Sequence, residues 1–72
     1  MKYVLIDWVK DGDAFTKEFK TAEEAVESAS YDWEHLSEID KNKTSEFYVL
    51  ESANPDEDAE DHFDGNIVKR WK

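Results

Sequence analysis

The periodic segment Thr21–Ile39 constrains the fold more than any other part of the chain. Its apolar residues recur at steps of three and four, the spacing of one face of an α-helix; they are Ala22, Ala25, Val26, Ala29, Trp33, Leu36 and Ile39. Thr21 and Glu24 have the spacing of a capping box at the start, and Asn42 is a candidate left-handed terminator at the end. The pattern predicts one helix over about residues 22–39, with small residues near its start and bulky ones near its end.

Four shorter segments have the composition of β-strands, and they cover about residues 2–9, 14–19, 45–52 and 66–71. The first is apolar on both faces, which predicts a central strand. Asp11 and Gly12 follow it and supply the turn of a hairpin. In the second strand, Lys17 stands between Phe15 and Phe19, so we expect an edge strand in which the lysine stem covers the rings and the ammonium reaches water.

The lengths of these segments determine the predicted topology. A helix of this length reaches along a whole strand, so the strand after it runs parallel to the strand before it. When the apolar first strand lies between those two, every neighbouring pair is antiparallel, and a last hairpin adds the fourth strand. The sequence of 72 residues therefore predicts a single α+β domain, a two-layer ββαββ fold with strand order 2-1-3-4 and one helix on one sheet face.

One helix covers only one face of such a sheet. The residues that we expect toward the helix are Val4, Ile6, Trp8, Phe47 and Val49. The opposite face would then carry Tyr3, Leu5, Val9, Tyr48 and Leu50. Exposed, contiguous apolar surface often marks an interaction site, and the candidate protein contacts on this face are Tyr3, Leu5, Tyr48 and Leu50. The alternatives are that the loop at residues 54–63 folds over this face or that polar neighbours interrupt the apolar surface.

Composition and charge exclude several classes of function. The formal net charge of −10 opposes direct binding to nucleic acid and to anionic membrane surfaces. The chain has no cysteine, so disulfides and cysteine-ligated zinc are excluded. The apolar run near the N-terminus is too short for a membrane span and lacks a cleavage site, which predicts a cytoplasmic protein. Three Trp, three Tyr and four Phe predict a folded core and not a disordered chain.

The negative charge is concentrated in two stretches. The predicted helix has no Lys or Arg between Lys20 and Lys41, and the predicted loop at residues 53–65 is strongly acidic. Asp32 belongs to the same outer helix face as the glutamates. The candidate contacts of an acidic surface are Glu23, Glu27, Glu34, Glu38, Asp56, Asp58 and Asp61. Such a surface either keeps a small protein soluble and monomeric or binds a positively charged partner, in the limit as a mimic of nucleic-acid phosphates.

Motifs for catalysis and metal binding are missing from the sequence. The alternation of acidic residues in the loop fails the calcium-loop pattern, because Asp61 stands where glycine is required. His35 and His62 have no second histidine nearby, as zinc would need. No serine lies in a nucleophile elbow and no glycine-rich phosphate loop is present. The sequence therefore predicts no enzyme activity, no metal and no cofactor.

These inferences predict a small acidic accessory domain of bacterial type that is not an enzyme and binds another protein. The alternative function is an acidic nucleic-acid mimic that inhibits a DNA- or RNA-binding protein. We expect a monomer or a weak homodimer. A sheet-face partner should resist high salt, whereas a partner of the acidic surface should be released by it.

Overall fold

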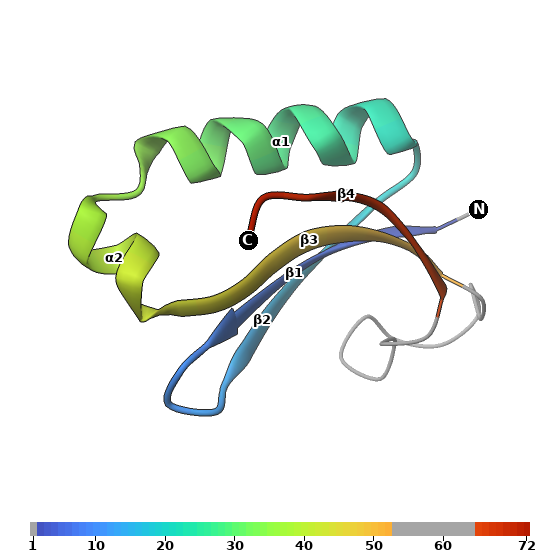
Figure 1. Cartoon of the computed structure of the whole chain (residues 1–72). Helices are drawn as coiled ribbons and strands as arrows, with labels where there is room; N and C mark the ends of the chain where they lie inside the picture. The colour runs from blue at the N-terminus through green and yellow to red at the C-terminus, as the bar shows by residue number, and fades with distance from the viewer. Residues whose placement is uncertain (1, 53–64) are drawn as a thin grey trace.

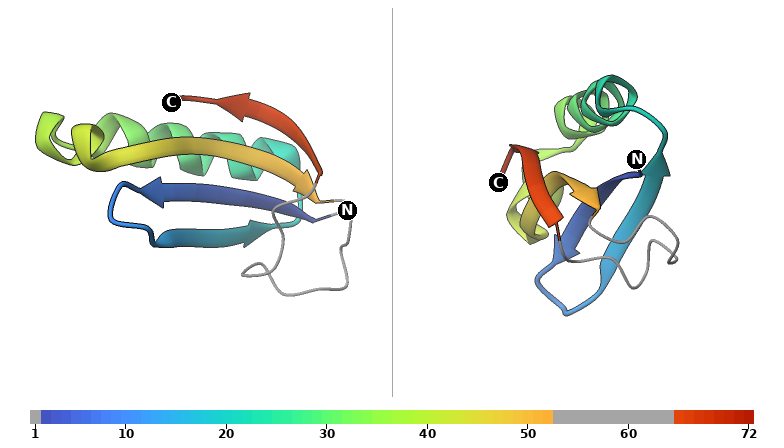
Figure 2. Two further views of the ribbon diagram at one scale, coloured as in Figure 1. Left: turned by 60° about the horizontal axis from the view of Figure 1, so that its bottom comes forward. Right: turned by 90° about the vertical axis from the view of Figure 1, so that its right-hand side faces the viewer.

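The computed structural model describes residues 2–52 and 65–72 and shows a four-stranded antiparallel sheet with one long helix packed on one face (Figure 1). The strand order is β2-β1-β3-β4, as Figure 2 shows from two further sides. The elements are β1 Tyr3–Val9, β2 Ala14–Phe19, α1 Ala22–His35, α2 Glu38–Lys43, β3 Thr44–Ser52 and β4 Gly65–Arg70. The predicted α+β class and strand order are confirmed. The predicted acidic loop lies outside the described residues, apart from Gly65 at the start of β4.

The hairpin between β1 and β2 forms at the predicted turn. The Val9 amide donates to the Asp13 carbonyl at 2.8 Å, and the Gly12 amide donates to the Val9 carbonyl at 2.9 Å. Gly12 has φ +101°, a backbone conformation that residues with a Cβ rarely adopt. β2 pairs with β1 only, within the described residues, so it is an edge strand as predicted.

The predicted single helix is wrong in its last turn, because the chain leaves the helix at Leu36 (φ −73°, ψ 138°). A second, short helix then starts, and Ser37 is its N-cap: the Ser37 hydroxyl accepts from the Asp40 amide at 3.1 Å. Serine side chains satisfy free amides at helix starts, so they favour a new start over continuation. As a result Ile39, predicted on the buried face, lies in α2 and is 68% exposed.

The end of α2 also differs from the prediction. No residue other than glycine has positive φ within the described residues, so Asn42 is not a left-handed terminator. The chain passes directly from α2 into β3 at Thr44, which has extended backbone angles. The Thr44 hydroxyl lies 3.1 Å from the Asp40 carbonyl and donates to it, which ties the last turn of the helix to the first residue of the strand.

The core lies on both faces of the sheet. On the helix side, Leu5, Phe47 and Val49 pack with Ala25 and Ala29 of α1. On the far side, a second buried cluster joins strands β1 and β3, and its members are Val4, Ile6, Tyr48 and Leu50. The far side of the sheet is thus as well buried as the helix side.

The assignment of β1 to the two faces is the reverse of the prediction. Directly opposite residues of an antiparallel pair share a face, and the register sets Leu5 opposite Val49 and Val4 opposite Leu50. Leu5 therefore faces the helix with Val49, while Val4, Ile6 and Trp8 face away. Sequence patterns showed which residues alternate in each strand but not how the two strands align.

A bulge changes the faces of β4. The register with β3 shifts between Val49 and Leu50, so Ile67 and Arg70 both lie on the far side, opposite Leu50 and Tyr48. Trp71 instead packs on the helix-side cluster, edge-on to Phe47 with 5.8 Å between the ring centroids.

Neither helix within residues 2–52 and 65–72 combines the length and the apolar composition that crossing a membrane requires.

Candidate functional site

A groove of about 450 Å³ lies between the C-terminal half of α1 and the strands β1 and β2. In Figure 1 the sheet turns away from α1 toward the β1–β2 hairpin, so the two layers separate at this end. Near the start of α1 the fully buried Ala25 and Ala29 allow close contact instead. The groove is lined by Leu5, Asp7, Phe15, Thr16, Lys17, Asp32, His35, Leu36 and Phe47.

The floor of the groove is a row of three residues across three strands. Asp7 of β1 lies opposite Phe15 of β2 on one side and opposite Phe47 of β3 on the other. Phe47 is buried, but Phe15 is 65% exposed, an unusual exposure for a phenylalanine on a sheet edge. The floor therefore presents one carboxyl group between two aromatic rings.

Asp7 is the most unusual polar group of the groove. Its Oδ1 atom is buried and accepts no hydrogen bond within the described residues. Burial raises the pKa of the Asp7 carboxyl, and the negative charge of Asp32 on α1 raises this pKa further. Both effects disfavour the ionised form. The fold thus holds the two carboxyl groups near enough for the charge of Asp32 to act on Asp7.

The rim carries two side chains that are held away from Asp7. The His35 ring stacks on Tyr31 with 4.0 Å between the centroids, and its Nδ1 lies 2.8 Å from the Tyr31 carbonyl. The Lys17 ammonium lies over the Phe19 ring, 5.5 Å from its centroid. The predicted arrangement, in which the lysine stem covers both rings, is therefore not found, since the ammonium itself meets Phe19 and Phe15 stays 65% exposed. Phe19 pairs with Tyr3, at the opposite end of β2 from the Phe15–Asp7 pair. Lys17 is therefore directed away from the carboxyl group on the floor.

This arrangement is chemically suited to a cation that carries an apolar stem. The aromatic and aliphatic side chains of the groove favour apolar contact, while the partly buried Asp7 offers negative charge where Coulomb attraction is stronger than in water. The exposed Asp32 adds a second negative charge at the groove. A volume of about 450 Å³ lies within the usual range of ligand sites. Unpaired buried polar groups with shifted pKa values cluster at functional sites.

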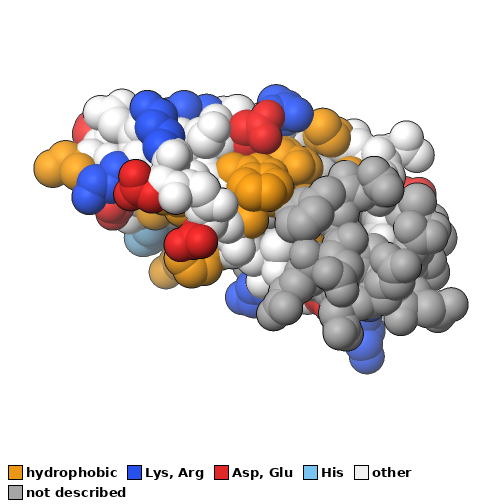
Figure 3. Space-filling model, turned by 90° about the horizontal axis from the view of Figure 1, so that it is seen from below, with side chains coloured by type: hydrophobic (Ala, Val, Ile, Leu, Met, Phe, Trp, Pro, Cys, Tyr) orange, Lys and Arg blue, Asp and Glu red, His pale blue; other side chains and the backbone are white. Residues whose placement is uncertain are grey.

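The residues predicted as a sheet-face site do not form one surface. Leu5 lies on the helix side and Tyr3 packs against the same cluster, whereas Tyr48 and Leu50 lie on the far side. Their exposed fractions are also small: 6% for Leu5, 8% for Tyr48 and 2% for Leu50. Figure 3 looks at the far side, where hydrophobic side chains gather beside the grey residues. The prediction of a large exposed apolar face built from these four residues is wrong.

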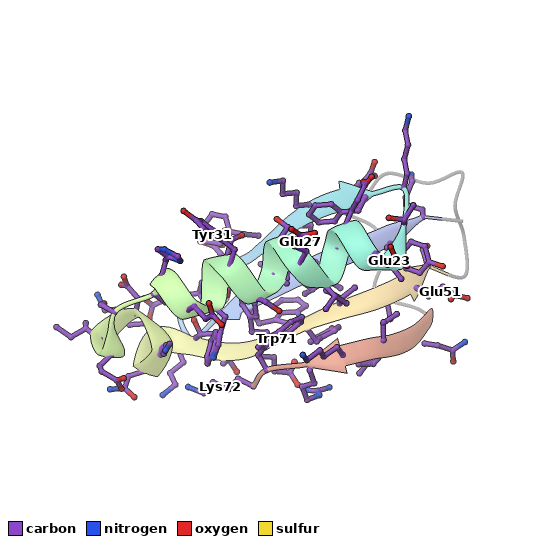
Figure 4. All side chains as sticks on the ribbon, turned by 90° about the horizontal axis from the view of Figure 1, so that it is seen from above. Glu23, Glu27, Tyr31, Glu51, Trp71 and Lys72 are labelled. Carbon is purple, nitrogen blue, oxygen red and sulfur yellow. The ribbon has the colours of Figure 1, made fainter. Side chains whose placement is uncertain are left out.

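The acidic-surface residues of the helices are exposed as predicted. Glu23, Glu27 and Glu34 lie on the exposed side of α1, and Glu38 lies in the first turn of α2. Figure 4 looks down on α1 and shows Glu23 and Glu27 along it, with Tyr31 on the side of β2 and Trp71 on the side of β4. None of the four glutamates forms an ion pair within the described part of the chain. Asp56, Asp58 and Asp61 lie outside it.

The two acidic groove residues, Asp7 and Asp32, were not among the sequence candidates. Asp7 carried a visible signal, because it is the only charged residue in the apolar run from Tyr3 to Val9. Asp32 was assigned to the outer helix face, but it lines the groove and acts on Asp7. The two residues are 25 positions apart, so only the folded chain brings them together.

Within residues 2–52 and 65–72, no three His, Asp or Glu side chains come together as a metal-binding group. Comparison of the chain with known protein families, curated proteins and solved structures gave no match.

Proposed function

We propose that this protein is a small, non-enzymatic binding domain whose partner is another protein with a positively charged segment. The groove between α1 and β2 is the primary site, and the exposed glutamates of α1 attract the partner toward it. The observation that carries the proposal is the buried, unpaired Oδ1 of Asp7 beside Asp32 in an otherwise apolar groove. A partner cation would supply the missing hydrogen-bond donor and neutralise both carboxylates.

Charge supports a basic partner on a larger scale. The chain has a formal net charge of −10, and such a field accelerates encounter with positively charged surfaces. Glu23, Glu27 and Glu34 extend this field along the exposed side of α1. The same three residues favour the second candidate function, a mimic of nucleic-acid phosphates that occupies a nucleic-acid-binding protein. In that case the contacts would centre on the helix and not on the groove.

A capture experiment separates these two functions. Immobilised wild-type protein and two double variants would be incubated with lysate of the source organism, washed at low and then high salt, and the bound proteins identified by mass spectrometry. Asp7→Asn with Asp32→Asn removes two charges from the groove. Glu23→Gln with Glu27→Gln removes two charges from the outer helix face and is the matched control.

We expect a specific partner that the wild type and the helix variant retain at low salt and that the groove variant loses. Loss only with the helix variant, together with a nucleic-acid-binding protein as the captured species, would favour the mimic. A partner that all three proteins retain through high salt would contradict both functions, because neither set of charges would then matter for binding.

A further inference from the structure

We propose that the groove and the free edge of β2 form one site, which binds an extended, arginine-containing segment of the partner as an added strand. This inference rests on the proposed function and specifies how the partner is held. Its two structural requirements are an edge that accepts a strand and a cation site within reach of that edge.

The edge is provided by β2. This strand pairs with β1 on one side and with no other strand of the described chain. The backbone N–H and C=O groups of such an edge form a template for another strand, and many domains bind extended peptides in this way. Because β2 also forms one wall of the groove, a strand added there would lie along the groove opening.

The distance from the edge of β2 to Asp7 determines which side chain of the partner can reach the Asp7 carboxyl group. Neighbouring strands lie about 4.8 Å apart, so an added strand would lie about 10 Å from β1 and from Asp7. A short polar side chain would not cross this distance. The long stem of arginine would lie on the exposed Phe15 ring, to which a guanidinium is also attracted as a cation. The guanidinium would then reach Asp7 and Asp32, and its five N–H groups suit two carboxylates better than a lysine ammonium does.

Charge complementarity distinguishes this occupant from a second copy of the same chain. Pairing of two β2 edges would bring together two molecules that each carry a net charge of −10. It would also leave both Asp7 carboxylates unpaired, because the lysine of the facing edge, Lys17, is held over Phe19. A basic segment of another protein would be attracted by the negative charge and would bring a cation to Asp7. The observations therefore favour a basic partner over self-association.

The test uses a defined probe, a ten-residue peptide of alternating arginine and valine with acetylated and amidated ends. Binding would be followed by the amide signals of the ¹⁵N-labelled full chain, at an ionic strength of about 0.15 M, where the screening length is about 8 Å. We expect the largest shifts in β2 and at Asp7. Replacing arginine by citrulline keeps the shape and removes the charge, and it should weaken binding at least tenfold, as the loss of a charge-assisted hydrogen bond does.

Two further comparisons test the two requirements separately. Asp7→Asn should weaken binding of the arginine peptide about tenfold or more, whereas the matched charge change Glu23→Gln on the outer helix face should change it less than about twofold. Peptides N-methylated at every second amide, in each of the two registers, test backbone pairing. One of the two registers should bind at least tenfold more weakly, because methylation removes the donors that face β2.

Three results would overturn the inference. The first is that the signal shifts are confined to the outer face of α1, and the second is that Asp7→Asn and Glu23→Gln weaken peptide binding equally. The third is that both methylated peptides bind as tightly as the unmethylated one. Absence of any binding by the arginine peptide would overturn it as well. These results would leave the proposed function in place if the capture experiment yields a basic partner. Failure of that capture experiment would instead contradict the proposed function itself.

Discussion

Asp7 opposes the stability of the free domain, and in the proposed function the same residue binds the partner. Its Oδ1 atom is buried without a hydrogen bond within the described residues, and its charged form is disfavoured by burial and by Asp32. Its neighbours on the two adjacent strands are Phe15 and Phe47, two apolar residues. A function outside the folding of the free domain explains such a residue best.

Asp7→Asn should stabilise the free protein at neutral pH. An acid with a raised pKa in the folded state keeps its proton longer there than in the unfolded state, where the pKa is about 3.9. Folding stability therefore falls as the pH rises above about 3.9, and the loss is complete once the pH exceeds the raised folded-state pKa of Asp7. Asparagine cannot ionise and so removes this loss, and we expect a gain of the order of 1 kcal/mol at pH 7, the usual scale of a single substitution.

Thermal or urea unfolding at pH 7 and at pH 3 would measure this effect. The gain should be clear at pH 7 and much smaller at pH 3, where the carboxyl group is protonated in both states. A variant that is less stable than the wild type at pH 7 would show that the Asp7 carboxylate contributes to the fold. The same charge change at Glu23 is the control, and it should alter stability by less than about 0.5 kcal/mol.

At the scale of elements, the position of α1 over the sheet depends on a change in residue size along the helix. Ala25 and Ala29 are fully buried at the end where the layers are close. Trp33 fills the space where they separate, with its ring 5.1 Å from that of Phe47 and with the Lys41 ammonium 5.3 Å from its centroid. Trp33 therefore supports one wall of the groove from behind.

Trp33→Ala should lower the free energy of unfolding by about 3 kcal/mol. Truncation of a buried tryptophan removes about 3–5 kcal/mol, and we expect the low end because this side chain is only partly buried. Tyr31→Ala is a matched control on the same helix, since Tyr31 is 62% exposed and its loss should change stability by less than about 1 kcal/mol. Equal effects in urea unfolding would show that α1 packs on the sheet with a different face.

The break between α1 and α2 also belongs to this scale. A continued helix would have carried Leu36 and Ile39 along the same face. The cap at Ser37 instead turns the chain, so that Leu36 remains at the groove while Ile39 is exposed. The end of α1 is thereby placed beside the groove, with Asp32 and His35 in its last turn.

At the scale of the whole molecule, negative charge is the dominant property. Two ion pairs are formed within the described residues, Lys2 with Glu18 at 3.2 Å and Arg70 with Glu46 at 3.3 Å. Both are solvent-accessible and so contribute little to stability. The net charge of −10 is therefore balanced mainly by ions of the solvent.

Salt should accordingly raise the melting temperature of the free protein. At 0.01 M ionic strength the screening length of about 30 Å exceeds the radius of gyration of 11.6 Å, so the excess negative charge gives a net repulsion across the whole molecule. At 0.1 M this length falls to about 10 Å, and we expect a rise of a few degrees in sodium chloride. Potassium chloride, as the control, should give the same rise. A fall with salt would show that attractive ion pairs outweigh the general repulsion.

The sequence by itself determined the local features of this protein. Spacing of apolar residues placed the main helix, Thr21 marked its start, Asp11 and Gly12 marked the hairpin, and the lengths of the segments predicted the strand order. The helix, its start and the hairpin depend on residues close together in the chain, where backbone preferences and hydrogen bonds act directly. The strand order follows from how far each segment reaches.

Only the tertiary structure decided the faces of the strands and the site. A shift of register by one residue exchanges the two faces of a strand, and apolar side chains on both faces of β1 gave no preference for either register. The same packing brought Asp7 of β1 and Asp32 of α1 to one groove and buried the residues expected at an open face. Such contacts join distant parts of the chain, and their energy depends on how the helix and the sheet pack together. A local sequence pattern holds no information about that packing.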